Sequence, residues 1–263
     1  MTSGSPQKIN FDQLTENSLK WLDWIEGATK LQGLIKGNVN FDGLEGDEKK
    51  FVASRLNEVA PNRQLLLNSV YITMTAGFEE YLRTTLKAMA DNLNQEAKPP
   101  NAHHKTLVNF NIRETAKLLR RMDSPPDYIT FNHDDLCRIL GSCATGSQAV
   151  QFNGEALSDV DGLIRLKNFC ERAEGLGKRV DLDVAAKDPA IKIALKQEKN
   201  NSARDVRKLL EDELEIISRY RNRIAHIGGN ASDVTEPVLR SHKYLLSAVA
   251  VAIENQIQNR AKK

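Results

Sequence analysis

The stretch that decides the fold is residues 61–93, PNRQLLLNSVYITMTAGFEEYLRTTLKAMADNL. Apolar side chains recur in it at three- and four-residue spacing, from Leu65 to Met89, which predicts one long helix. Pro61 fits the start of a helix, where a backbone N–H is not needed. Ala76 and Gly77 lie in the middle, and such small residues allow a second helix to approach closely.

Helical spacing continues through the rest of the chain. Longer helices are predicted over residues 11–34, 106–122, 158–174 (with Ser158 as a candidate N-cap), from 202 or 205 to the glycines at 228 and 229, and 234–263. Shorter helices are predicted over 47–59, 134–140 and 188–197, and the only candidates for short strands are 128–131 and 149–152. We therefore predict an all-α fold, a helical bundle.

The length of 263 residues fits one large domain or two small ones. We expect a flexible tail over residues 1–10 and a single helical domain over 11–263, with a poorly mapped insertion at about 124–180. Trp21 and Trp24 lie three apart in the predicted helix 11–34, and we expect their face to pack inward. The alternative is that the two rings form a platform on which RNA bases stack.

Composition excludes several classes of protein. Hydrophobic content of 40% and charged content of 27% are typical of a globular chain, not of a disordered one. A net charge of +2 means that any nucleic-acid binding must come from a local basic patch. The three cysteines lack the spacing of a zinc site or a disulfide framework, and no signal peptide or membrane-spanning run is evident. We expect a cytoplasmic protein with no metal, cofactor or membrane partner.

The motif that suggests chemistry is RYRNRIAHIGG, residues 219–229. In a helix, Ser218, Asn222 and His226 lie within about 80° of one another, whereas Arg221 lies about 140° from His226. One regular helix does not aim Arg221 and His226 at the same small target without help from the length of the arginine side chain or from a looser last turn before Gly228 and Gly229. A two-fold dimer in which two such helix ends face each other would line one cleft with both groups.

These residue types suit metal-independent cleavage of RNA. Histidine transfers protons near neutral pH, arginine binds and stabilises phosphate, and the Asn222 carboxamide can orient the histidine or hydrogen-bond a phosphate oxygen. The alternative is structural, because cations are favoured at a helix C-terminus by the helix dipole. For Glu79 and Glu80 two roles also remain open, since either could orient an arginine of the cluster around Arg221, or be solvated or paired locally with Arg83 or Lys87.

The segment Arg221-Asn222-Arg223-Ile224-Ala225-His226, followed by glycine and a final helix, resembles the Arg-polar-His signature of the HEPN superfamily (higher eukaryotes and prokaryotes nucleotide-binding). Gly77 to Leu82 resembles the early helix of the RiboL-PSP and related prokaryotic HEPN families. The resemblance implies a homodimer with a composite site and metal-independent endoribonuclease activity. Many members are toxins or phage-defence effectors restrained by an antitoxin or sensor protein. It also implies that Arg221 and His226 are the catalytic pair, with Asn222 their polar neighbour.

Further basic residues are candidates for binding the RNA. Arg219 and Arg223 flank the motif, and Arg120 and Arg121 belong to a basic face of the predicted helix 106–122. A solvated surface is the alternative reading of that basic face. The alternative function for the whole chain is a non-catalytic helical module that binds RNA, a nucleotide or a protein partner.

Overall fold

The computed structural model describes residues 5–38, 46–47, 50, 63–95, 98, 104–144, 149–197, 201–227 and 234–261. Within these ranges every regular element is a helix, which confirms the all-α prediction. The two candidate strands, 128–131 and 149–152, are irregular, and the predicted helix 47–59 lies almost entirely outside the described residues. None of the described helices is both long and apolar enough to cross a membrane.

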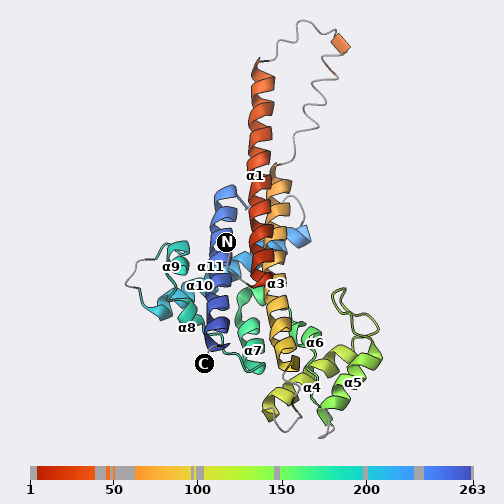
Figure 1. The fold of residues 1–263 in the computed structure, drawn as a ribbon. Coiled ribbons are helices and arrows are strands. Elements are labelled where there is room, and N and C mark those ends of the chain that lie inside the picture. Colours follow the sequence, from red (N-terminus) through yellow and green to blue (C-terminus); the bar gives the residue numbers. More distant parts are fainter. Residues whose placement is uncertain are drawn as a thin grey trace.

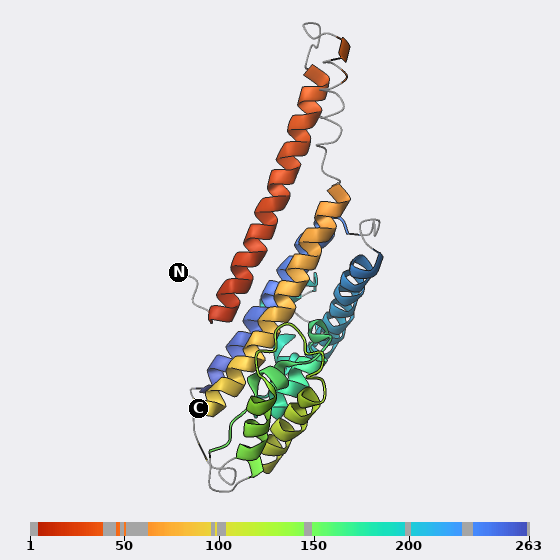
Figure 2. The same ribbon diagram turned by 90° about the vertical axis from the view of Figure 1, so that its right-hand side faces the viewer.

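Three long helices form the axis of the molecule. These are α1 (Pro6–Asn38), α3 (Arg63–Gln95) and α11 (Glu236–Ala261), which lie side by side in both views (Figures 1 and 2). A fourth, α10 (Ala203–Ile227), packs against α3 and carries the RYRNRIAHI motif to its end. Gly228 and Gly229, the predicted stop, lie just beyond Ile227 and outside the described residues.

The buried stripe of α3 is the centre of the core. Tyr71, Phe78 and Leu82 are fully buried, as the three- and four-residue spacing predicts. At Gly77 the neighbouring helix α1 comes so close that an added Cβ would lie 2.2 Å from Cδ2 of Leu14. The small residue in the middle of α3 therefore permits a close approach, as the sequence predicted.

The prediction for the tryptophans is wrong. Trp21 and Trp24 are 59% and 63% exposed, and their rings contact each other at a centroid distance of 5.8 Å. The buried face of α1 contains Phe11, Thr15 and Ser18. At about 100° per residue around the helix axis, Trp21 lies about 80° and Trp24 about 140° from Phe11. Beyond this region α1 extends past the start of α3 (Figure 2). Because α1 begins at Pro6, the predicted tail over residues 1–10 is also too long.

Most buried residues in the middle of the chain belong to the same core, while Leu118, Leu136 and Ala156 form a second, smaller cluster. This part of the chain contains α4 (Lys105–Leu119), α5 (His133–Ala144), α6 (Gly154–Ser158), the 3-10 helix η3 (Leu163–Arg165) and α7 (Lys167–Gly175). The predicted helix 158–174 is broken, because Gly162 and Leu166 take left-handed backbone angles, with φ of 67° and 58°. Ser158 therefore ends α6 and does not cap a long helix. The short helices α8 (Leu182–Ala185) and α9 (Pro189–Ala194) pack against α11.

A buried polar chain joins α3, α10 and α11. The Tyr71 hydroxyl lies 2.7 Å from Nδ1 of His242, and Nε2 of His242 lies 2.9 Å from Oε1 of Glu213. Burial lowers the pKa of His242, although the nearby Glu213 opposes this shift. Tyr220 packs against both rings, at centroid distances of 6.0 Å from Tyr71 and 5.9 Å from His242. These contacts hold α10 in register beside α3 at the residue next to Arg221.

Candidate functional site

A polar pocket of about 450 Å³ lies between α3, α10 and the segment before α7. We call it the Arg221 pocket. α3 contributes two charged residues one turn apart, α10 contributes part of the sequence motif, and the rest comes from residues 160–168. Its lining consists of Glu79, Arg83, Val160, Asp161, Gly162, Arg165, Asn168, Ser218, Arg221 and Asn222.

Arg221 is held inside this pocket by two neighbours. Its Nη2 donates to Oε2 of Glu79 at 3.3 Å, and its Nη1 donates to Oδ1 of Asn222 at 3.0 Å. Of the two adjacent carboxylates in α3, Glu79 therefore orients Arg221, whereas Glu80 lies 3.6 Å from Arg83 and pairs locally. Each carboxylate takes one of the two roles that the sequence left open.

Glu79 is the more unusual of the two carboxylates. Its side chain is 19% exposed, against 60% for Glu80. Burial raises the pKa of the Glu79 carboxyl above its ordinary value, while Arg221 and Arg83 act in the opposite direction and Asp161 adds to the rise. The pocket thus places an acid with a raised pKa beside the arginine of the motif, a combination typical of functional sites.

The raised pKa predicts a specific dependence of stability on pH. A carboxyl whose pKa is higher in the folded state stabilises that state while protonated, and this contribution is lost as the pH rises through the folded value. The Glu79→Gln variant lacks this titrating carboxyl. Its free energy of unfolding should therefore increase relative to that of the wild type as the pH rises from about 4 to about 7. Urea unfolding across this range measures the difference.

The matched control is Glu80→Gln, which changes the exposed neighbour in the same helix. Its stability should stay within about 0.5 kcal/mol of the wild type, as expected for an exposed residue. If Glu79→Gln instead lost stability relative to the wild type as the pH rose, attraction to Arg221 would outweigh burial, and the pKa of Glu79 would be lowered.

The loop at residues 159–162 closes one side of the Arg221 pocket. Nη1 of Arg83 donates to the carbonyl oxygen of Ser158 at 3.2 Å, and Nδ2 of Asn168 donates to that of Asp161 at 2.7 Å. Arg121, in the turn that follows α4, lies with its Nη1 2.8 Å from Oδ2 of Asp159. The loop and its approach are therefore fixed by side chains of α3 and α7 and by one side chain of the turn that follows α4.

His226 lies one turn beyond Asn222 on α10 and is exposed to solvent. Ser218 and Asn222, which share its face of the helix, both line the Arg221 pocket, whereas His226 does not. A single protomer thus brings Arg221, Asn222 and Glu79 together and leaves the imidazole on the adjoining surface. This agrees with the angle of about 140° between Arg221 and His226 expected for a regular helix.

The other predicted RNA-binding residues are spread over two surfaces. Arg219 is exposed and its Nε lies 3.1 Å from Glu215, and Arg223 is exposed at the next turn. Arg120 is exposed at the end of α4, while Arg121 is bound to Asp159. Of these four residues, Arg121 is the one tied to the loop of the Arg221 pocket.

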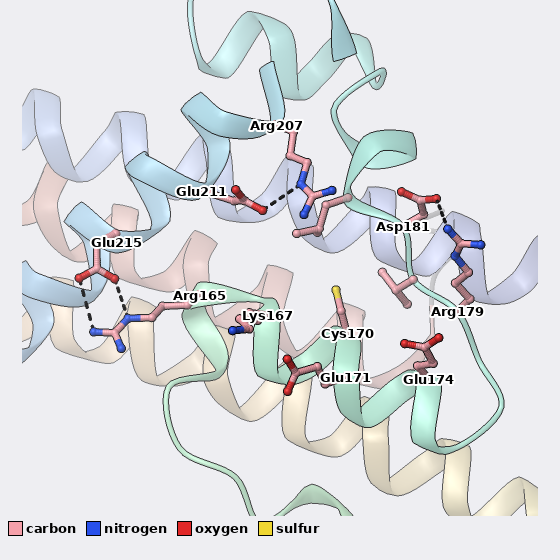
Figure 3. A pocket seen from close by; sticks show the side chains of 12 residues that line it. Arg165, Lys167, Cys170, Glu171, Glu174, Arg179, Asp181, Arg207, Glu211 and Glu215 are labelled. Carbon is pink, nitrogen blue, oxygen red and sulfur yellow. Dashed lines mark hydrogen bonds and ion pairs between the residues drawn. The ribbon is translucent and has the colours of Figure 1, made fainter. Parts of the chain in front are cut away.

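A second pocket, of about 520 Å³, shares Arg165 with the first and is drawn in Figure 3. We call it the Cys170 pocket. Burial raises the pKa of the Cys170 thiol to about 12, so the sulfur is a thiol and a poor nucleophile at neutral pH. The pocket is lined by Arg165, Lys167, Cys170, Glu171, Glu174, Arg179, Val180, Asp181, Leu182, Arg207, Glu211 and Glu215.

Sequence reasoning missed most of the residues that surround Arg221. Asp161, Arg165 and Asn168 come from the middle segment, which carries no motif of its own.

In the described part of the chain, no group of three or more histidine, cysteine, aspartate or glutamate side chains is arranged to hold a metal ion. No known family model, curated protein or solved structure matches the chain.

Proposed function

We propose that the protein is a metal-independent endoribonuclease of the HEPN type, with its site at the C-terminal end of α10. The observation that supports this best is the Arg221 pocket, which holds a guanidinium, a carboxamide and a partly buried carboxylate, one helical turn from the exposed imidazole of His226. These groups match the needs of phosphodiester cleavage: a fixed cation, hydrogen-bond donors and a proton carrier.

The reaction would proceed by attack within the RNA strand. The 2′-oxygen loses its proton to a base and forms a bond to the adjacent phosphorus. The bond from phosphorus to the 5′-oxygen breaks, and that oxygen takes up a proton, leaving a 2′,3′-cyclic phosphate and a 5′-hydroxyl. His226 transfers protons, and Arg221 stabilises the negative charge that builds up on the phosphate oxygens.

A homodimer would complete the site. With two copies related by a two-fold axis, the ends of both α10 helices face each other, and Arg221 of one chain can approach the imidazole carried by the other. His226, Arg219 and Arg223 are exposed near this end of α10, on the surface that a second copy and RNA would contact. An antitoxin or sensor protein that covers the same end would restrain the activity.

A second candidate function has its own support. Arg221 already has a carboxylate and a carboxamide as partners, and His226 does not line the same pocket. A module that binds RNA, a nucleotide or a protein partner needs the Arg221 pocket alone, without an imidazole. Such a module would be non-catalytic.

One experiment separates the two functions. The wild-type protein is incubated with end-labelled single-stranded RNA in excess EDTA, and binding is measured in parallel. We expect cleavage that survives chelation, with fragments that end in a cyclic phosphate and begin with a 5′-hydroxyl. Binding without cleavage would favour the non-catalytic module, and cleavage that chelation abolishes would contradict a metal-independent mechanism.

A further inference from the structure

The Arg221 pocket and the Cys170 pocket share one face of α10. Arg207, Glu211 and Glu215 line the Cys170 pocket, and Ser218 and Asn222 line the Arg221 pocket. Together with His226, these residues lie within about 100° on the helix, over a length of about 28 Å. Arg165 lines both pockets and pairs with Glu215 at 2.6 Å, so the two cavities meet at this ion pair.

The charges of the Cys170 pocket disfavour a strongly charged ligand. Its arginines are paired, as Arg207 with Glu211 at 2.9 Å and Arg179 with Asp181 at 3.4 Å (Figure 3). Lys167, Glu171 and Glu174 form no ion pair with any other described residue. A phosphate would face the carboxylates, and a cation would face the arginines and the lysine. A neutral ligand that offers hydrogen-bond donors avoids both penalties.

Part of the lining of the Cys170 pocket is apolar. Val180 and Leu182 line it and are almost fully buried, and Cys170 directs its sulfur toward the side on which Arg207 lies (Figure 3). Contact with apolar side chains and with a guanidinium is how proteins bind unstacked bases of single-stranded RNA.

We propose that the Cys170 pocket is a nucleobase subsite that selects guanine. This rests on the proposed function, since the base would belong to an RNA strand whose backbone reaches the Arg221 pocket along α10. The Watson–Crick edge of guanine carries adjacent N–H donors, which one carboxylate can accept together. Glu171 and Glu174 project from one side of α7 as carboxylates of this kind. Uracil offers a single N–H on that edge and fits less well.

The first arm of the test uses free nucleosides and needs no RNA cleavage. Ligand-observed NMR measures binding of guanosine and uridine to the wild type, to Cys170→Phe, which fills the pocket, and to Cys137→Phe. Cys137 is exposed on α5, so it is the matched control. We expect the wild type and Cys137→Phe to bind guanosine more strongly than uridine. The Cys170→Phe variant should no longer bind guanosine.

A second variant guards against misfolding of Cys170→Phe. Glu171→Ala combined with Glu174→Ala changes only exposed side chains, and it should abolish the preference for guanosine over uridine. Equal guanosine signals from the wild type, Cys170→Phe and the double variant would overturn the subsite.

The second arm measures RNA binding to the His226→Ala variant, which should keep the strand intact. Removing one guanine base, while leaving its sugar and phosphate, should weaken binding by about tenfold at one position. In the Cys170→Phe background the same change should have almost no effect, because the base no longer has a pocket. An equal loss in both backgrounds would overturn the proposal.

The two arms separate the subsite from the ribonuclease. RNA cleavage without guanosine binding would retain the proposed function and reject the subsite. Guanosine binding by a wild type that leaves RNA intact would retain the nucleobase pocket and reject the ribonuclease.

Discussion

The His226→Ala variant should cleave single-stranded RNA about 10²–10⁴-fold more slowly than the wild type, because it lacks the group that transfers protons. The imidazole is exposed at the end of α10, so its removal leaves the core unchanged, and the melting temperature should stay close to that of the wild type. Single-turnover cleavage of labelled RNA, measured with excess EDTA, gives the rate.

The control for this change is His133→Ala. His133 is also exposed but begins α5, in the middle segment of the chain. Its loss should leave the cleavage rate within about twofold of the wild type, as expected for a surface residue away from the site. If the wild type and His226→Ala cleaved RNA at equal rates, the imidazole would have no role in the reaction.

The Arg221→Ala variant should cleave RNA about 10²–10³-fold more slowly than the wild type, because no fixed cation stabilises the charge that develops on the phosphate. Arg221→Lys keeps the charge but loses the forked geometry, so it should recover RNA binding better than it recovers cleavage. Comparison of kcat with KM for both variants separates these effects.

A structural explanation for a slow Arg221→Ala variant can be tested directly. The substitution leaves Glu79 without the guanidinium that now lies 3.3 Å away, and this alone could destabilise the pocket. Adding Glu79→Gln removes the unpaired carboxylate and should recover stability. Cleavage should remain low in the double variant. If cleavage returned together with stability, Arg221 would have only a structural role.

Local periodicity predicted the long helices well. α3, α10 and α11 each keep a continuous apolar stripe for most of their length, and their observed bounds lie within a few residues of the predicted ones. The middle segment was harder, because its helices are short and are broken at Gly162 and Leu166. Their positions depend on contacts with α3 and α10, which are distant in the sequence.

The candidate site could be predicted in part. One stretch of α10 was enough to predict Arg221, Asn222 and His226 as candidates. The sequence does not indicate whether the carboxylate of Glu79 or that of Glu80 lies beside Arg221. That choice depends on how α3 packs against α10. Helical geometry did predict that Arg221 and His226 diverge within one chain, and the pocket lining agrees.

The placement of both tryptophans on the outer side of α1 has a spectroscopic consequence. Because the chain contains only these two indoles and both face solvent, its intrinsic emission reports the surroundings of α1 and says little about the packing of α3 against α10 and α11. Emission should therefore change little when the core melts. A shift toward shorter wavelength on adding a macromolecule would indicate that the macromolecule covers this outer side of α1.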